Sequence, residues 1–181
     1  MTDTLAISVI VPAFNEERLL KNCLTSLTNQ NFHLPYEIIV VNNNSTDATS
    51  EIARGFKVTL VNEPQQGVIF ARQCGLTCSK GEIAACADAD SKYPKNWLTS
   101  LYAHFQNPLV VAVSGPAVLE PTPRWAFLWY KLWYSIIEIV YKHFGFVFYT
   151  GAFNFAFRRD IFWKLGGYRT YFDAGGDELD P

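Results

Sequence analysis

Short apolar runs alternate along this chain with segments of helical periodicity, and this alternation limits its fold more than any other feature. The apolar runs are rich in β-branched residues and are bounded by turn-forming residues, which is typical of buried strands. The expected strands are 6–14, 36–47 with its turn, 57–63, 82–90 and 109–115, and the expected helices are 16–30, 45–56, 67–81 and 93–106. Buried strands that alternate with helices predict a mainly parallel central sheet with helices on both faces. A chain of 181 residues suits one domain with a sizeable core, so we predict a single α/β domain over residues 1–181.

Polar side chains gather where four of the expected strands end. The clusters are Asn15–Glu16 and residues 42–47, 63–67 and 88–90. In open parallel sheets, ligands bind outside the carboxyl ends of the strands. The plainer alternative is that connecting loops are polar in general. Because four clusters fall at the same edge, we expect a ligand site there.

Asp88 and Asp90 close the apolar run 82–90, with one alanine between them. Because successive residues of a strand point to opposite faces, we expect both carboxylates to point the same way. Two carboxylates that close repel each other, so either a cation lies between them or the pair belongs to a solvated turn. Mg²⁺ and Mn²⁺ prefer oxygen ligands, and Mg²⁺ is commonly held by one or two carboxylates together with substrate phosphates. We therefore expect Asp88 and Asp90 to bind Mn²⁺ or Mg²⁺ beside a phosphate-bearing substrate.

Several other classes of function are disfavoured. The chain has no G-x-x-x-x-G-K-[ST] sequence of a P-loop enzyme, and "VPAFNEE" follows the first strand where a dinucleotide-binding protein has G-x-G-x-x-G. A formal net charge of -2 argues against a nucleic-acid partner, because such proteins carry a basic excess. The four cysteines form no C-x-x-C pair, and the three histidines do not cluster with them, which disfavours a zinc site.

The N-terminal stretch "MTDTLAISVIVPAFNEE" has neither a basic region nor a long apolar run, so we expect no signal peptide. We expect a cytoplasmic protein with reduced thiols.

The segment "TPRWAFLWYKLWYSIIEIVYKHFGFVFY", residues 122–149, differs from the rest in its density of aromatic residues. Lys131, Glu138, Lys142 and His143 interrupt it, so it is not a clean membrane-spanning run. An aromatic-rich amphipathic helix can lie in a membrane interface or cover a hydrophobic core. The sequence leaves open whether residues 125–149 associate with a membrane surface or pack within the protein or between subunits.

Six stretches follow one another along the chain: "ISVIVPAFNEERLLKNCLTSL", "EIIVVNNNSTDATSEIA", "GVIFARQCGL", "CADAD", "TGAFNFAFRRDIFWKLGGY" and "GGDELD". In this order they resemble the motifs of the family 2 glycosyltransferases, which have the GT-A fold, a Rossmann-like α/β domain. Each stretch alone is unspecific, but together they span essentially the whole chain. The resemblance implies metal-dependent, inverting transfer of a sugar from a nucleotide-diphosphate-sugar donor to a hydroxyl of a glycan or lipid-linked acceptor. If the aromatic segment touches a membrane, the reaction would take place at its inner face.

The resemblance also implies which residues bind the donor, because in this family the turn after the first strand and the acid after the second hold the base and ribose. Asn42 stands where the family often has Asp, and its amide can still donate and accept hydrogen bonds. Arg72 falls where the family commonly has a basic residue near the donor; the alternative is a surface charge on a helix. The implied donor-binding residues are Pro12, Ala13, Asn15, Glu16, Asn42, Asp47, Gly67, Arg72, Asp88 and Ala89.

The stretch "GGDELD" resembles the family's acidic motif, whose second acid takes the proton from the acceptor hydroxyl. That position falls on Glu178, although the family order is Glu-Asp, so Asp177 is a rival for the base. In the stretch before it, Asn154 and Arg158 are either polar contacts of the site or ordinary strand and cap residues.

The resemblance divides the chain into a nucleotide-binding half, 1–115, and an acceptor-side half, 116–181. Because the family continues past the acidic motif, we expect a form shortened at its C-terminus. The alternative function is a nucleotide-sugar-binding domain without turnover. A metal-dependent phosphatase or nucleotidyltransferase would explain Asp88 and Asp90, but neither Asn15–Glu16 nor "GGDELD".

Overall fold

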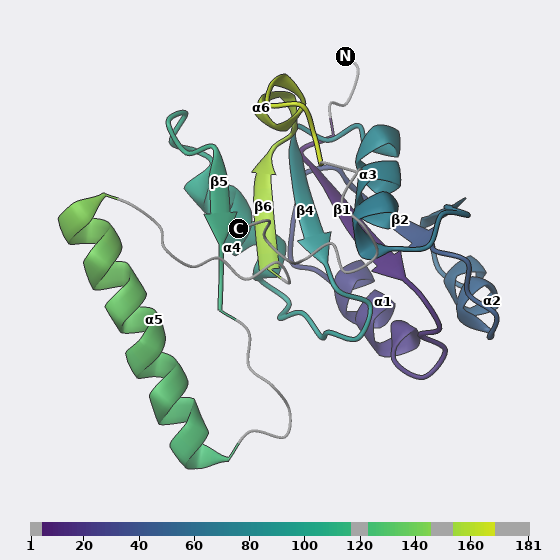
Figure 1. The fold of residues 1–181 in the computed structure, drawn as a ribbon, viewed down its shortest axis with the longest axis horizontal. Helices are drawn as coiled ribbons and strands as arrows, with labels where there is room; N and C mark the ends of the chain where they lie inside the picture. The colour runs from purple at the N-terminus through teal and green to yellow at the C-terminus, as the bar shows by residue number, and fades with distance from the viewer. Residues whose placement is uncertain (1–4, 117–122, 146–153, 169–181) are drawn as a thin grey trace.

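The computed structural model describes residues 5–116, 123–145 and 154–168, with the side chains of residues 124, 125, 127 and 130 left aside. Its strands form one six-stranded sheet in the order β3-β2-β1-β4-β6-β5 (Figure 1). The strands are β1 (Ile7–Ala13), β2 (Tyr36–Asn42), β3 (Thr59–Asn62), β4 (Ile83–Ala87), β5 (Ala112–Ser114) and β6 (Asn154–Arg158). The helices are α1 (Leu20–Thr28), α2 (Thr49–Arg54), α3 (Val68–Cys78), α4 (Trp97–His104), α5 (Arg124–Phe144) and α6 (Arg159–Lys164).

The sheet is mainly parallel, as the alternation of strands and helices predicts. β1 lies between β2 and β4 and runs parallel to both, and β3 extends the parallel part beyond β2. β6 pairs antiparallel with β4 and with β5, so the last two strands of the sheet depart from the parallel pattern. β1, β2 and β4 read as near-continuous apolar runs because both faces of a parallel sheet are covered.

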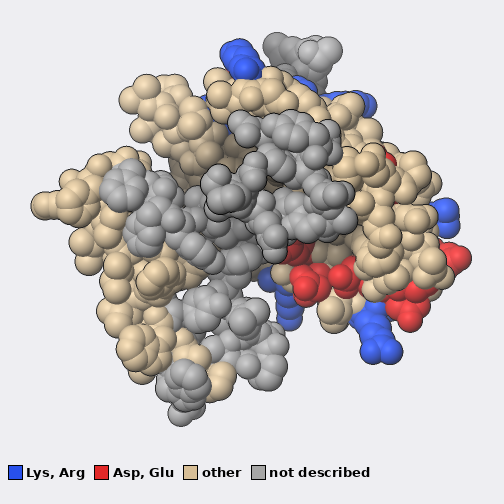
Figure 2. All heavy atoms as spheres, in the orientation of Figure 1, with Lys and Arg blue, Asp and Glu red and all other residues tan. Residues whose placement is uncertain are grey.

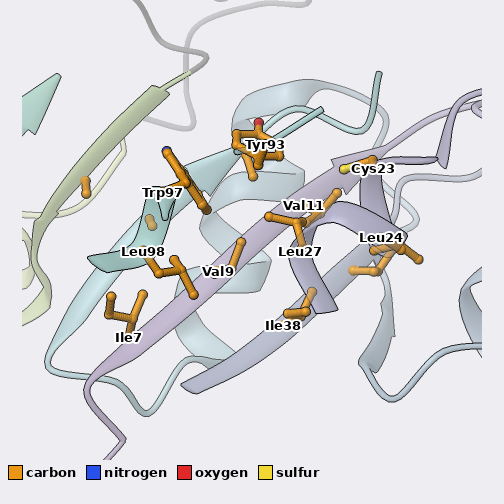
Figure 3. Close-up of a cluster of buried hydrophobic side chains, with 14 of the residues drawn as sticks. Ile7, Val9, Val11, Cys23, Leu24, Leu27, Ile38, Tyr93, Trp97 and Leu98 are labelled. Carbon is orange, nitrogen blue, oxygen red and sulfur yellow. The ribbon is translucent and has the colours of Figure 1, made fainter. Parts of the chain in front are cut away.

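Helices cover both faces of the sheet, which confirms the predicted architecture. Val9 and Val11 of β1 contribute to a core formed with α1 and α4, shown in Figure 3, where Leu24, Leu27 and Leu98 meet the strand. Ile10, on the opposite face, belongs to a second cluster whose members come from α3, β4, β6 and α6: Leu76, Ala84, Cys86 and Phe157, with Phe162 and Trp163 against them. α3 also packs on β2 through Ala71.

Most observed elements are shorter than expected, as α1 and α4 begin at Leu20 and Trp97, and three of the shifted ends have a local cause. β4 ends at Ala87, because residues 89 and 90 form a turn in which the N–H of Ser91 donates to the carbonyl of Asp88 over 3.2 Å. α2 begins at Thr49 and not at residue 45, and the Asp47 side chain accepts the N–H of Thr49.

α3 ends at Cys78, before Gly81. A Cβ on Gly81 would lie 2.5 Å from the backbone nitrogen of Ser8, so this glycine permits close passage of two chain segments and does not close the helix.

α5 is the longest described helix and stands apart from the sheet and the other helices in Figure 1. Within the described residues, no helix has both the length and the apolar content that crossing a bilayer requires.

Candidate active site

A pocket of about 610 Å³ opens at the carboxyl edge of the sheet, where β1 and β4 end and α3 begins. Its volume is in the range of sites for small molecules. All four polar clusters seen in the sequence contribute lining residues to it, and the cluster after β2 contributes Asn43. The lining residues are Pro12, Ala13, Phe14, Glu16, Asn43, Gln66, Gly67, Val68, Ala71, Asp88, Ala89 and Asp90.

Three carboxylates line this pocket: Glu16 after β1, and Asp88 and Asp90 after β4. Figure 2 shows acidic side chains gathered on the part of the surface close to where β4 ends in Figure 1. Partial burial raises the pKa of Glu16 above its ordinary value, and the negative charges of Asp90, Asp47 and Asp88 raise it further. Burial, followed by the charges of Asp90, Asp88 and Glu16, raises the pKa of the Cys23 thiol to about 12. The pocket therefore has an excess of negative charge that a bound cation would offset.

The backbone of Asp88 is fixed on both sides by buried side chains. Its N–H donates to the phenol oxygen of Tyr93 over 2.8 Å, and its carbonyl accepts the Cys23 thiol at 3.4 Å. Tyr93 is in turn held by Ser26, whose hydroxyl oxygen accepts the Tyr93 N–H over 3.0 Å. Because these partners belong to the core beneath α1, Asp88 is positioned before any ligand binds.

Arg72 of α3 contacts Asp88 from beneath the pocket lining. Its Nη2 lies 3.6 Å from Oδ1 of Asp88, a distance that marks an ion pair and is too long for a good hydrogen bond. Arg72 is only 8% exposed, and its Nε has no hydrogen-bond partner among the described residues. A buried donor of this kind is costly unless something accepts from it, which makes Arg72 a candidate ligand-binding group.

The loops after β1 and β2 are tied together by their own polar side chains. Asn15 adopts a positive φ of 56°, its N–H donates to the Ser45 hydroxyl over 3.1 Å, and its side-chain oxygen accepts the Thr46 N–H over 2.9 Å. Asp47 accepts the N–H groups of Glu17 and Thr49. Burial pushes the pKa of Asp47 up, but the hydrogen bonds from Thr49 and Glu17 outweigh it, and the net shift is downward.

A second tie joins the loops after β2 and β3, and it comes from Asn43. This side chain is 3% exposed; its Nδ2 donates to the carbonyls of Glu63 and Gln65, and its Oδ1 accepts the Gly67 N–H over 2.7 Å. Asn42, in contrast, donates to the Asn62 side chain and accepts the Ser45 N–H. Asn43 thus shapes the pocket wall on which α3 begins.

The predicted site residues therefore fall into three groups. Pro12, Ala13, Glu16, Gly67, Asp88, Ala89 and Asp90 line the pocket. Arg72 contacts Asp88 from beneath the lining, and Asn15, Asn42 and Asp47 hold the surrounding loops. Asp177 and Glu178 lie outside the described residues, so the structure gives no position for the predicted base.

Sequence reasoning missed Phe14, Asn43, Gln66, Val68 and Ala71 as lining residues. The asparagine run 42–44 marked the place, but alternation along β2 did not show which of the three turns toward the pocket. Arg158 lies at the opposite edge of the sheet, where its guanidinium donates to the carbonyls of Val110 and Phe105 and pairs with Glu82.

The pocket can hold a divalent cation only with help from a ligand. Within the described part of the chain, no three side chains of His, Cys, Asp or Glu are placed to hold one metal ion. Asp88 and Asp90 supply carboxylate oxygens, which suit Mg²⁺ or Mn²⁺, and phosphate oxygens or water would complete the coordination. The oxygen donors and the local excess of negative charge both fit this metal type.

Comparison with protein families identifies one model that matches most of the chain, "Glycosyl transferase family 2", over residues 8–166. Among curated proteins, "Glycosyltransferase AglE" of Haloferax volcanii is 40% identical over 106 residues, covering 54% of this chain and 35% of the relative. "Glucosyl-dolichyl phosphate glucuronosyltransferase" of the same organism is 25% identical over 184 residues, covering 95% of this chain and 58% of the relative. The chain therefore spans less than two thirds of the length of these relatives.

Among solved structures, the mannosyltransferase PcManGT from Pyrobaculum calidifontis, in complex with GDP-Man and Mn²⁺, superposes with a TM-score of 0.74. The two sequences are 26% identical, and the match covers 96% of this chain and 50% of the mannosyltransferase.

Proposed function

Because the chain belongs to glycosyl transferase family 2, we propose that it transfers a sugar from a nucleotide-diphosphate-sugar donor to a hydroxyl of a glycan or lipid-linked acceptor. The observation that carries this proposal is the pocket at the carboxyl edge, where Asp88, Asp90 and Glu16 meet beside Arg72. An acidic pocket with a buried guanidinium is suited to a ligand that brings both phosphate and a cation. A nucleoside diphosphate with Mg²⁺ or Mn²⁺ meets both requirements.

In this proposal, Asp88 and Asp90 hold the divalent cation. When bound, such an ion acts as a Lewis acid that stabilises the negative charge of the departing diphosphate. The Arg72 guanidinium, whose Nε has no acceptor among the described residues, adds a second positive group on the same side. The mannosyltransferase PcManGT was crystallised with Mn²⁺, which supports the choice of metal.

The donor base and ribose would lie against the loops after β1, β2 and β3. Pro12, Ala13 and Gly67 leave room for a flat ligand because their side chains are small or absent. Asn15, Asn42 and Asp47 would act by holding these loops in place, since their polar atoms bond to neighbouring loop residues. They therefore shape the donor pocket without facing it.

Inversion at the sugar carbon requires a base on the acceptor side. Glu178 is the first candidate and Asp177 the second, on the strength of the family's acidic motif. The base takes the proton of the acceptor hydroxyl as its oxygen attacks the sugar carbon, and the nucleoside diphosphate leaves from the opposite side. We place the reaction in the cytoplasm, which the four cysteines support because none forms a disulfide.

The second candidate function is nucleotide-sugar binding without turnover. The same pocket would serve it, because Asp88, Asp90 and the nearby Arg72 guanidinium concern the donor and not the acceptor. Transfer and binding are separated by measuring release of the nucleoside diphosphate from the donor in the presence of acceptor.

The test common to both candidates is calorimetric titration of the protein with GDP and with UDP, in the presence and absence of Mn²⁺. We expect one nucleotide to bind more tightly when Mn²⁺ is present. Asp90→Asn should abolish the Mn²⁺-dependent part, because it removes one charged ligand without changing the size of the side chain.

Asp160→Asn is the matched control for this titration. Asp160 lies in α6, which follows the end of β6 that pairs with the start of β4, at the opposite edge of the sheet. Its substitution should leave nucleotide affinity unchanged. Equal Mn²⁺-dependent affinity in the parent protein and Asp90→Asn would contradict the proposed metal site.

A further inference from the structure

The surface of α5 carries a concentration of exposed apolar side chains. Among the described residues, fourteen large hydrophobic side chains are exposed, and eight of them lie on this one helix. Leu128 and Trp129 are 68% and 65% exposed, and Ile139 is 65% exposed. Single exposed hydrophobic residues are ordinary on a protein surface, but a contiguous set marks a surface that binds something.

These side chains lie along one side of the helix. Leu128, Trp129, Leu132, Ile136 and Ile139 follow the spacing i, i+1, i+4, i+8 and i+11, which keeps them on one face. A polar stripe runs beside this face at a similar spacing: Lys131, Ser135, Glu138 and Lys142. The polar residues form a face parallel to the helix axis and are not confined to the helix ends. This is the pattern of a helix that lies along a boundary between apolar material and water.

The charge of α5 is opposite to that of the whole chain. The helix contains Arg124, Lys131 and Lys142 against the single acid Glu138, whereas the chain has a formal net charge of -2. Lys142 pairs with Glu138 at 2.6 Å, and three basic residues against one acid give the helix a positive formal charge. A negatively charged surface would therefore attract α5 and repel the acidic part of the protein.

The chain leaves the sheet for α5 and returns from it at the edge that carries the pocket. The Gly115 N–H, just after β5, donates to the carbonyl of Asn154 at the start of β6 over 2.9 Å. Asn154 is paired in the sheet with Ala87, and Asp88 comes next in the chain. Gly115, after which the chain leaves the sheet for α5, and Asn154, at which it returns, therefore lie near the proposed donor site.

We propose that α5 lies flat in the interface of an anionic lipid membrane, with its apolar face in the boundary between headgroups and acyl chains. The lysine side chains extend from the stripe toward lipid phosphates, with their carbon stems against the acyl region. This proposal rests on the proposed function and extends it. A membrane that binds α5 would keep the donor site close to acceptors carried by lipid.

The composition of the face favours lipid over a protein partner. Trp129 and Trp133 lie on it, and tryptophan is enriched where an apolar layer meets water. The charged residues of the polar stripe, from Lys131 to Lys142, run beside the apolar face, where a lipid surface supplies phosphate that attracts lysine.

The experiment is co-sedimentation of the whole chain with vesicles, in the absence of metal, donor and acceptor. One vesicle set contains phosphatidylcholine alone, and the other contains phosphatidylcholine mixed with phosphatidylglycerol. We expect binding to the mixed vesicles, and we expect added salt to weaken it because the charges lie near the surface. Leu128→Ser with Leu132→Ser should reduce binding about tenfold or more, since two side chains no longer enter the apolar layer.

Two control variants match these changes elsewhere on the protein. Leu109→Ser with Leu165→Ser removes two leucines that are 86% and 81% exposed outside α5, and it should bind as the parent does. For charge, Lys131→Glu with Lys142→Glu should weaken binding to the mixed vesicles. Lys57→Glu with Lys80→Glu, which changes two exposed lysines outside α5, should weaken it much less. Circular dichroism melts of every variant exclude unfolding as the cause.

Three results would overturn the proposal: no sedimentation of the parent with either vesicle, equal loss in the leucine control, or equal, salt-insensitive binding to both vesicles. A dimer in analytical ultracentrifugation that dissociates in the Leu128→Ser, Leu132→Ser variant, without vesicle binding, would identify a second copy as the occupant. Nucleotide binding is measured without lipid, so failure of the proposed function and failure of this inference are distinguishable.

Discussion

Nη2 of Arg72 and Oδ1 of Asp88 lie 3.6 Å apart, and this ion pair joins α3 to the turn that carries both aspartates of the pocket. Arg72 is nearly buried, and its Nε has no acceptor among the described residues. The described residues therefore do not satisfy the hydrogen-bonding capacity of the Arg72 guanidinium. A phosphate that binds beside Asp88 would interact with the positive charge of this guanidinium, whose Nη2 already lies 3.6 Å from Asp88.

We predict that Arg72→Leu weakens nucleoside diphosphate binding by about 10- to 100-fold, the range for one charge-assisted hydrogen bond of about 1.5–3 kcal/mol. The affinity of Arg72→Lys should lie between those of Arg72→Leu and the parent protein, because lysine keeps the positive charge but lacks the planar guanidinium. Calorimetric titration in saturating Mn²⁺ measures both. The control is Arg54→Leu, which replaces an exposed arginine at the end of α2 and should leave the affinity unchanged. If Arg72→Leu binds the nucleotide as tightly as the parent protein does, Arg72 does not contact the donor.

A second prediction concerns Glu16 and pH. Its pKa in the folded protein is raised above 4.5, first by burial and then by Asp90, Asp47 and Asp88. Between its unfolded and folded pKa values, the native state holds more protons than the unfolded state. The free energy of unfolding therefore falls as pH rises through this window.

Glu16→Gln removes this penalty, so the variant should melt at a higher temperature than the parent near pH 7. The difference should shrink as the pH falls below 4.5, where Glu16 is protonated in both states. Thermal melts across this pH range test the prediction. Glu51→Gln removes one exposed carboxylate away from the pocket, and an equal gain there would assign the effect to net charge alone.

The third prediction concerns Asn154, which connects β6 to the α4 side of the core. The indole Nε1 of Trp97, a residue 6% exposed, donates to Oδ1 of Asn154 over 2.9 Å, and Nδ2 of Asn154 donates to the carbonyl of Pro116 over 3.2 Å. Asn154→Ala leaves the buried indole N–H without this acceptor. We expect a loss of about 1–3 kcal/mol in the free energy of unfolding, measured by urea denaturation.

Asn154→Asp keeps an acceptor for Trp97 and should cost less than Asn154→Ala. In a double-mutant cycle with Trp97→Phe, the two changes should be non-additive by about 0.5–3 kcal/mol, because they remove the same hydrogen bond. Additive costs would show that this bond contributes nothing to stability.

The fourth prediction concerns the base. In a form of the protein that shows turnover, Glu178→Gln should reduce the rate by about two to four orders of magnitude if Glu178 accepts the proton. Donor affinity should change little, because the base contacts the acceptor. Asp177→Asn should then cost much less, and single-turnover rates of the two variants decide between them. A dead Asp177→Asn with an active Glu178→Gln reverses the assignment.

The sequence alone predicted the parallel part of the sheet and the edge at which the site lies. The apolar runs of β1, β2 and β4 are buried on both faces, so their composition shows directly where they are. Polar clusters that follow such strands must gather at the carboxyl edge, because parallel strands all end there. For this reason Glu16, Gly67, Asp88 and Asp90 could be assigned to one pocket without a structure.

Only the tertiary structure decided what each polar side chain does at that edge. Asn15 and Asn43 look alike in sequence, yet Asn15 ties two loops together, while Asn43 is buried and shapes the pocket wall. Asp88 is held by Tyr93 and Cys23 and meets Arg72, three contacts from three different parts of the chain. Strand and helix periodicity arises from local geometry and can be read along the chain. Loop hydrogen bonds and ion pairs join segments distant in sequence, so their partners are fixed only when the sheet brings the loops together.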